Sequence, residues 1–278
     1  MMRALVIGLS LALGGASLAA QGVMVAPHAV FIDHRVRSGS VLLYNPGTEP
    51  VEVSISTLFG YPITDSTGAI TLRTVDAPDS TLPSALSWIQ AFPRRLTVGP
   101  KERQTIRLLA RPPVGLADGE YWVRLVIAAQ AGSVPITGVS DTTAIQVGLK
   151  LEVRTIIGVN YRKGPVTTGL ALSNVRAQLV GDTLVSRARL ERRGNAAFIG
   201  TVRETLVDST GAVRASYRSP LGVYFTMEPR LATVIAPPKL PRGRYWLRYE
   251  VATEREDLDP TVVLKAPAVR DSVQVLVP

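Results

Sequence analysis

After residue 22, apolar residues recur at every second position, and Gly, Pro, Asn and Asp separate these segments at short intervals. Successive side chains of a β-strand point to opposite faces, so the pattern predicts strands with one apolar face, joined by tight turns. The clearest alternation lies between residues 145 and 153, and its apolar members are Ile145, Val147, Leu149, Leu151 and Val153. The sequence therefore predicts an all-β protein of the sandwich class.

Two series of strands are expected. The first series covers residues 23–32, 39–44, 51–58, 69–75, 104–110, 120–129 and 144–157, with 84–90 as a short turn or strand. The second covers residues 174–180, 183–191, 198–207, 212–217, 222–227, 230–236, 244–253 and 270–277. The stretch 158–169 breaks the alternation, and we expect the domain boundary there.

Two internal repeats indicate that the two series form related domains. The turn sequence DSTGA occurs at residues 65–69 and again at 208–212. In both series a Gly-x-Tyr sequence precedes a long strand, at Tyr121 and Tyr245. This arrangement resembles the tyrosine corner of immunoglobulin-like sandwiches, in which the phenol bonds back to the preceding corner. We therefore expect two immunoglobulin-like β-sandwich domains in tandem, at residues 21–158 and 159–278.

Residues 1–20 have the layout of a secretory signal peptide. Arg3 precedes an apolar run, and small residues follow it up to Ala19 and Ala20. A membrane anchor is the alternative, but the apolar run is short for a span. We expect cleavage, export, and a mature chain without a membrane span.

Composition limits the chemistry that this chain could perform. It has no cysteine and only two histidines, His28 and His34, which lie six positions apart on one expected strand, about 20 Å at roughly 3.3 Å per residue. These residues cannot together bind one metal, so no metal site, cofactor or enzymatic activity is expected. The formal charge of +9 predicts a solvated basic surface or an acidic partner. Nucleic acid is a poor candidate partner for an exported protein.

Several segments of the first half resemble the N-terminal domain of periplasmic pilus-assembly chaperones, the PapD-like family. The matching segments are residues 25–31 (VAPHAVF), 42–47 (LLYNPG) and 92–100 (FPRRLTVGP), followed by 104–108 (QTIRL). The resemblance covers about residues 23–157. It implies a divergent periplasmic chaperone whose partners are a secreted fibre or pilus subunit and an outer-membrane assembly protein.

The resemblance also implies a binding mode. In that family the last strand of the first domain is donated to an incomplete subunit, and residues 145–153 occupy its place. The family holds the subunit's terminal carboxylate with two basic residues in the cleft between the domains. The first position matches His28, and the second most nearly Arg154, with Lys150 as the other candidate.

A second interpretation needs no partner. An apolar strand face is ordinary in any sandwich, so residues 145–153 could pack within their own domain. The chain would then be an exported structural or adhesive protein of two immunoglobulin-like domains, without chaperone activity.

Overall fold

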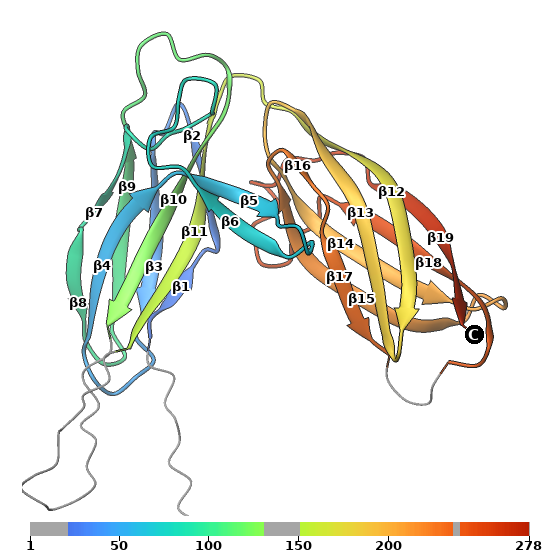
Figure 1. Cartoon of the computed structure of the whole chain (residues 1–278). Coiled ribbons are helices and arrows are strands. Elements are labelled where there is room, and N and C mark those ends of the chain that lie inside the picture. Colours follow the sequence, from blue (N-terminus) through green and yellow to red (C-terminus); the bar gives the residue numbers. More distant parts are fainter. Residues whose placement is uncertain (1–21, 131–150, 236–239, 278) are drawn as a thin grey trace, which may run out of the picture.

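The computed structural model describes residues 22–130, 151–235 and 240–277 (Figure 1). Every regular element in these ranges is a β-strand, and the strands form two sandwiches, which confirms the expected all-β, two-domain class. Within the same ranges, no helix has the length and apolar character needed to cross a membrane. The expected signal peptide at residues 1–20 lies outside the described residues, as do Ile145, Val147, Leu149 and Lys150.

The first domain is a sandwich of two sheets, in the strand orders β1-β3-β9-β7 and β2-β11-β10-β4-β8, with a β5-β6 hairpin attached. Its strands are β1 (Met24–Ala26), β2 (Ala29–Asp33), β3 (Ser38–Tyr44), β4 (Val51–Leu58), β5 (Gly60–Thr64), β6 (Ile70–Thr74), β7 (Ile89–Phe92), β8 (Arg95–Val98), β9 (Arg103–Ala110), β10 (Gly119–Gln130) and β11 (Glu152–Lys163). The inward faces bury one continuous apolar core that includes Val41, Ile106, Leu125 and Ile127.

The second domain pairs β13 with β12, β16 and β17 in one sheet, and has the order β15-β14-β18-β19 in the other. Its strands are β12 (Thr168–Val180), β13 (Thr183–Gly194), β14 (Phe198–Val207), β15 (Val213–Val223), β16 (Thr226–Met227), β17 (Arg230–Val234), β18 (Gly243–Ala252) and β19 (Val269–Val277). Its interior holds two apolar clusters, one around Leu190 and Phe198 and the other around Leu206 and Leu247.

The structure divides differently from the sequence pattern at several places. In the second domain, β15 (Val213–Val223) is one strand where two were expected, at 212–217 and 222–227. Two further differences concern the first domain. The single strand expected at residues 23–32 is two strands on different sheets: β1 pairs with β3, whereas β2 runs parallel to β11. Pro27 lies between them and has no N–H to donate to a ladder. At the other end of the domain, β11 stays paired with β10 as far as Lys163. The chain therefore leaves the first sandwich after Lys163, five residues beyond the boundary expected at 158.

Both tyrosine corners are present. The Tyr121 hydroxyl donates to the Ala117 carbonyl at 3.0 Å, and the Tyr245 hydroxyl donates to the Pro241 carbonyl at 2.8 Å. Each bond spans four residues and fixes the corner that leads into the long strand, β10 or β18. The prediction from the Gly-x-Tyr repeat is confirmed in both domains.

The two DSTGA turns also have the same structure. In each, one aspartate oxygen accepts hydrogen bonds from the threonine N–H, the threonine hydroxyl and the alanine N–H. The second turn joins β14 to β15, and the first joins β5 to β6. The β5-β6 hairpin reaches from the first domain to the second (Figure 1), where Arg230 N–H donates to Gly68 O at 2.8 Å and Glu228 N–H donates to Thr64 Oγ1 at 3.0 Å.

Gly68→Ala and Gly211→Ala form a matched pair that tests this docking. Both glycines have positive φ, +86° and +84°, but a Cβ at Gly68 would lie 2.7 Å from Arg230 Cβ, whereas none of the surrounding atoms lies within 4 Å of one at Gly211. We expect each variant to lose about 1 to 2 kcal/mol of stability from backbone strain. Only Gly68→Ala should accelerate hydrogen exchange at the Arg230 amide. Equal exchange in the two variants would contradict the docking.

A buried carboxyl group lies in the interior of the second domain. Glu204 on β14 is 1% exposed and accepts a short hydrogen bond from the Ser186 hydroxyl on β13. Its other oxygen, Oε2, and the hydroxyl of Tyr249, which lies opposite on β18, have no hydrogen-bond partner among the described residues. Burial raises the pKa of Glu204, and the bond from Ser186 opposes that rise only in part.

Glu204→Gln should remove a pH dependence from the stability of the second domain. Because the folded chain holds the Glu204 proton more tightly than the unfolded chain, the free energy of unfolding falls as pH rises from the ordinary pKa of 4.5 towards the raised folded value. Urea unfolding at a series of pH values measures this slope. Glu256→Gln, at a carboxylate that is 81% exposed, is the control. An unchanged slope in Glu204→Gln would refute the interpretation.

Candidate functional site

Among the described residues, one edge of β11 is unpaired along part of its length. All of β11 pairs with β10 on one side, but on the other side β2 pairs only with Gly158 to Arg162. The edge is open because the chain before β2 belongs to the other sheet, where β1 pairs with β3. Within the described part of the chain, residues 153–157 therefore have a free backbone edge, about 17 Å long at roughly 3.3 Å per residue.

The hydrogen-bonding groups on this edge follow from the register. His34 N–H donates to Arg162 O, so the peptide groups of Arg162 point away from β10. The β10-β11 register has no shift, and peptide groups alternate in direction along a strand. The N–H and C=O groups of Arg154 and Ile156 therefore point to the free side. An extended segment could bond to both residues.

Apolar side chains are exposed along the same stretch. Leu151 is 51% exposed, Val153 38% and Ile156 43%. Val153 lies opposite Ala129, which is part of the core of the first domain, so Leu151 and Val153 continue the core side of the strand into solvent. Ile156 lies on the other face, beside Val126. The two described members of the stripe predicted from the sequence are thus partly exposed.

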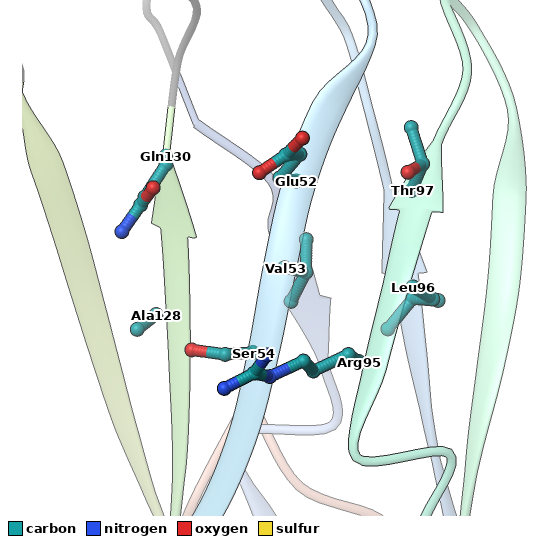
Figure 2. Close-up of a pocket in the computed structure, with 8 residues that line it drawn as sticks. All are labelled: Glu52, Val53, Ser54, Arg95, Leu96, Thr97, Ala128 and Gln130. Carbon is teal, nitrogen blue, oxygen red and sulfur yellow. The ribbon is translucent and has the colours of Figure 1, made fainter.

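The outer face of the same sheet is hollowed towards its opposite edge, at β8. A shallow pocket of about 510 Å³ lies over β4, β8 and β10 (Figure 2), and its lining residues are Glu52, Val53, Ser54, Arg95, Leu96, Thr97, Ala128 and Gln130. The lining is mainly small or polar, with Glu52 and Arg95 as opposite charges. Gln130 is also adjacent to the free edge, because its amide nitrogen donates to Glu152 Oε2 at 3.0 Å.

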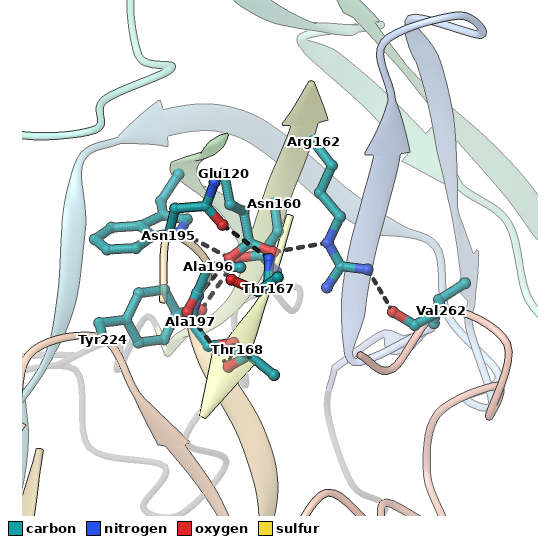
Figure 3. Close-up of polar contacts among 11 residues, drawn as sticks. Glu120, Asn160, Arg162, Thr167, Thr168, Asn195, Ala196, Ala197, Tyr224 and Val262 are labelled. Carbon is teal, nitrogen blue, oxygen red and sulfur yellow. Dashed lines mark hydrogen bonds and ion pairs between the residues drawn. The ribbon is translucent and has the colours of Figure 1, made fainter. Parts of the chain in front are cut away.

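A buried ion pair connects the two domains near the end of β11, where β2 covers the strand (Figure 3). Arg162 Nε on β11 donates to Glu120 Oε2 on β10 at 2.7 Å, and the Glu120 side chain is fully buried. The other Glu120 oxygen accepts from the Trp122 indole at 2.9 Å and from the Ala197 N–H of the second domain at 3.0 Å. Arg162 Nη1 also donates to Val262 O, at 2.6 Å. Glu120 and Arg162 therefore bind both domains together.

Apolar packing surrounds this network. Phe59, Tyr61 and Trp122 of the first domain form one buried cluster with residues of the second, including Tyr224 and Leu258. The Trp122 and Tyr224 rings meet edge to face, with their centroids 4.7 Å apart. The domain junction is therefore a packed core of its own, and the relative position of the domains is fixed by burial as well as by charge.

Arg124 is a buried cation at the point where the free edge ends. Its Nε donates to Gly60 O at 2.8 Å, and its guanidinium lies 4.6 Å from the centroid of the Tyr224 ring. Its Nη2 and the neighbouring Asn160 Nδ2 have no hydrogen-bond partner among the described residues. A Cβ at Gly158 would lie 2.7 Å from Arg124 Nη1, so the guanidinium occupies the space that a side chain at 158 would need.

The candidate anchor residues lie apart from one another. His28 directly precedes Ala29, which pairs with Gly158, and its ring lies 3.5 Å from Asp257 of the second domain. Arg154 is 69% exposed and bonds to Glu152 at 2.5 Å. It lies four residues before Gly158, about 13 Å at roughly 3.3 Å per residue. The structure thus places His28, but not Arg154, at the closed end of the edge, and Lys150 lies outside the described residues.

The sequence analysis did not single out Glu120 or Arg124. Both lie in β10, where the residues from Tyr121 to Ala129 are otherwise apolar on both faces. A charged residue within such a strand must be buried, and buried charges need partners. The charged residues inside and directly before this apolar run were therefore the available sequence signal for a polar site.

Comparisons with known proteins find similarity in structure only. No family model and no curated protein match the sequence. The CupB2 chaperone of Pseudomonas aeruginosa matches 91% of this chain and 100% of its own, at 13% identity and a TM-score of 0.42. The YadV chaperone matches 91% and 98%, at 14% identity and a TM-score of 0.45. The CsuC-CsuE chaperone-tip adhesion subunit complex of Acinetobacter baumannii Csu pili matches 91% and 98%, at 12% identity and a TM-score of 0.44.

Proposed function

We propose that this protein is a periplasmic chaperone that binds a secreted fibre or pilus subunit by strand addition along β11. The free edge of residues 153–157 is the observation that carries the proposal. Strand addition obtains affinity from main-chain hydrogen bonds and register from alternate apolar side chains. The edge offers both, since the peptide groups of Arg154 and Ile156 point outward and Leu151 and Val153 are partly exposed.

The contact with the subunit is proposed to extend along this chain to the residues that precede the described edge. The stripe predicted at Ile145, Val147 and Leu149 has the same parity as Leu151 and Val153. All five apolar residues would then lie on one face of the donated strand. This face would fill a groove in a subunit that lacks a strand, and delivery to an outer-membrane assembly protein would follow.

The closed end of the edge suits a terminal carboxylate. A segment whose carboxyl end meets the start of β2 runs parallel to β11 and stops beside Gly158. The buried Nη2 of Arg124 and Nδ2 of Asn160, which have no hydrogen-bond partner among the described residues, belong to side chains beside Gly158, and His28 is next to Ala29. A guanidinium and an amide can both donate to one carboxylate. We therefore propose Arg124 as a principal anchor, with His28 beside it, in place of the Arg154 or Lys150 expected from sequence.

Arg154→Pro and Arg154→Ala separate the backbone edge from the side chain. Proline removes the outward N–H at 154 and leaves the β10 ladder intact, because prolines are tolerated on the open side of edge strands. The probe is a dye-labelled peptide that alternates valine with serine. We expect Arg154→Pro to reduce its affinity at least about tenfold, the effect of roughly 1.4 kcal/mol. Arg154→Ala should bind as the wild type does.

Fluorescence anisotropy measures the affinities, and circular dichroism checks that both variants fold. A peptide of the same composition with its valines grouped together is the control, and it should bind weakly. Equal affinity of Arg154→Pro and Arg154→Ala for the alternating peptide would count against strand addition at this edge. It would favour the structural or adhesive alternative.

The anchor is tested with the same alternating peptide carrying either a free or an amidated C-terminus. Wild-type protein should prefer the free carboxylate about tenfold, because a charge-assisted hydrogen bond contributes roughly 1.5 to 3 kcal/mol. Arg124→Gln should lose this preference yet keep binding to the amidated peptide. Arg154→Ala should retain the preference. No difference between the two peptides with the wild type would exclude a carboxylate anchor.

A further inference from the structure

Three arginines lie side by side in one cross-strand row of the second domain. Arg176 on β12 is opposite Arg187 on β13, and Arg187 is opposite Arg230 on β17. Residues directly opposite in antiparallel strands have Cβ atoms about 4.5 to 5.5 Å apart, and like charges there are destabilising. We call Arg176, Arg187 and Arg230 the arginine row. Such a row costs stability unless a negative charge lies against it.

A β-bulge produces this row. Between Ser173 and Arg176 the β12-β13 register shifts by one residue, and Asn174 in the bulge has φ of 52°. Without the extra residue Arg176 would lie opposite Ser186, which is 1% exposed and faces the core. Bulges re-aim side chains, and this one turns Arg176 to the outer face beside Arg187.

The structure supplies too few carboxylates for these groups. Glu228 lies 3.8 Å from Arg176 Nη2 and 3.2 Å from Arg189 Nη1, so it is shared by two arginines. Arg187 Nη2 donates instead to a neutral oxygen, Thr67 O, at 2.6 Å. In the described ranges no ion pair joins Arg187 or Arg230 to a carboxylate.

Two hollows adjoin the row. One of about 280 Å³ lies between the hairpin tip, at Thr67 and Ala69, and the side chains of Arg187 and Arg230. The other, of about 200 Å³, is lined by Arg176, Arg187 and neighbours on β12 and β13. Asp65, the nearest acidic residue of the hairpin, accepts three bonds within its own turn through Oδ1. The charged groups that line the space beside the hairpin tip are therefore the guanidiniums of Arg187 and Arg230.

We propose that the arginine row binds a multiply charged oxyanion, a phosphate group, between the β5-β6 hairpin and the second domain. Among the described residues, the row and Arg189 together have one ion-paired carboxylate, Glu228, which lies against Arg176 and Arg189. A monovalent carboxylate would therefore leave most of the excess charge unbalanced. Guanidinium groups bind phosphate through paired, parallel hydrogen bonds. The phosphate is carried either by a free ion or by a lipid headgroup that ends in a phosphate monoester, and both present three terminal oxygens.

The test is calorimetric titration of the full chain with inorganic phosphate in a chloride buffer. Arg230→Gln is the informative variant, because the Arg230 side chain has no bonded partner in the described structure and its loss leaves the fold intact. We expect Arg230→Gln and Arg176→Gln each to weaken binding about tenfold, the loss of one charge-assisted bond. Arg193→Gln removes the same charge from β13, the central strand of the row, at a position outside the row, and should bind within about twofold of the wild type.

Cosedimentation with phosphatidylcholine vesicles, with and without phosphatidic acid, whose headgroup is a phosphate monoester, distinguishes the two sources. Binding to phosphatidic acid that inorganic phosphate displaces and Arg230→Gln abolishes would identify a lipid headgroup. Binding of inorganic phosphate without vesicle binding would identify a free phosphate. The proposal is overturned if neither probe binds, if Arg193→Gln weakens binding as much as Arg230→Gln, or if a glutamate-rich peptide binds and phosphate does not.

Discussion

The Glu120 carboxylate is the group on which the arrangement of this molecule depends. It receives hydrogen bonds from an arginine of β11, from the Trp122 indole of its own strand, and from a backbone N–H of the second domain. Removing one partner of a buried pair of this kind costs about 3 to 5 kcal/mol, because a charge is left buried without compensation. The apolar cluster and the docked hairpin add further contacts between the two domains.

The junction also explains why the edge of β11 stops where it does. The last residues of β11 are committed to Glu120, Val262 and β2, whereas its first residues are not. One strand therefore has a structural half and an open half. The buried Glu120–Arg162 ion pair and the apolar cluster around Trp122 and Tyr224 fix the position of the structural half. The open half therefore extends from a fixed part of the strand.

Local patterns were enough to predict most of the fold. Alternation located most strands, and the repeated turns and tyrosine corners indicated two related domains, because each depends on residues within a few positions of one another. The sequence missed β5 and β8, which are short and carry weak alternation. It also missed the sheet switch at Pro27, the placement of Arg124 and the bulge at Asn174. These depend on which strands meet, and that is decided by contacts between residues far apart in the chain.

The sheet switch at Pro27 has one further consequence. The position at which the chain crosses from β1 to β2 sets how many residues of β11 remain uncovered, since β2 begins to pair at Ala29. Each residue by which that crossing moved would lengthen or shorten the open stretch by about 3.3 Å. The residue at which the first strand changes sheets therefore determines the length of the open edge on the last strand of the domain.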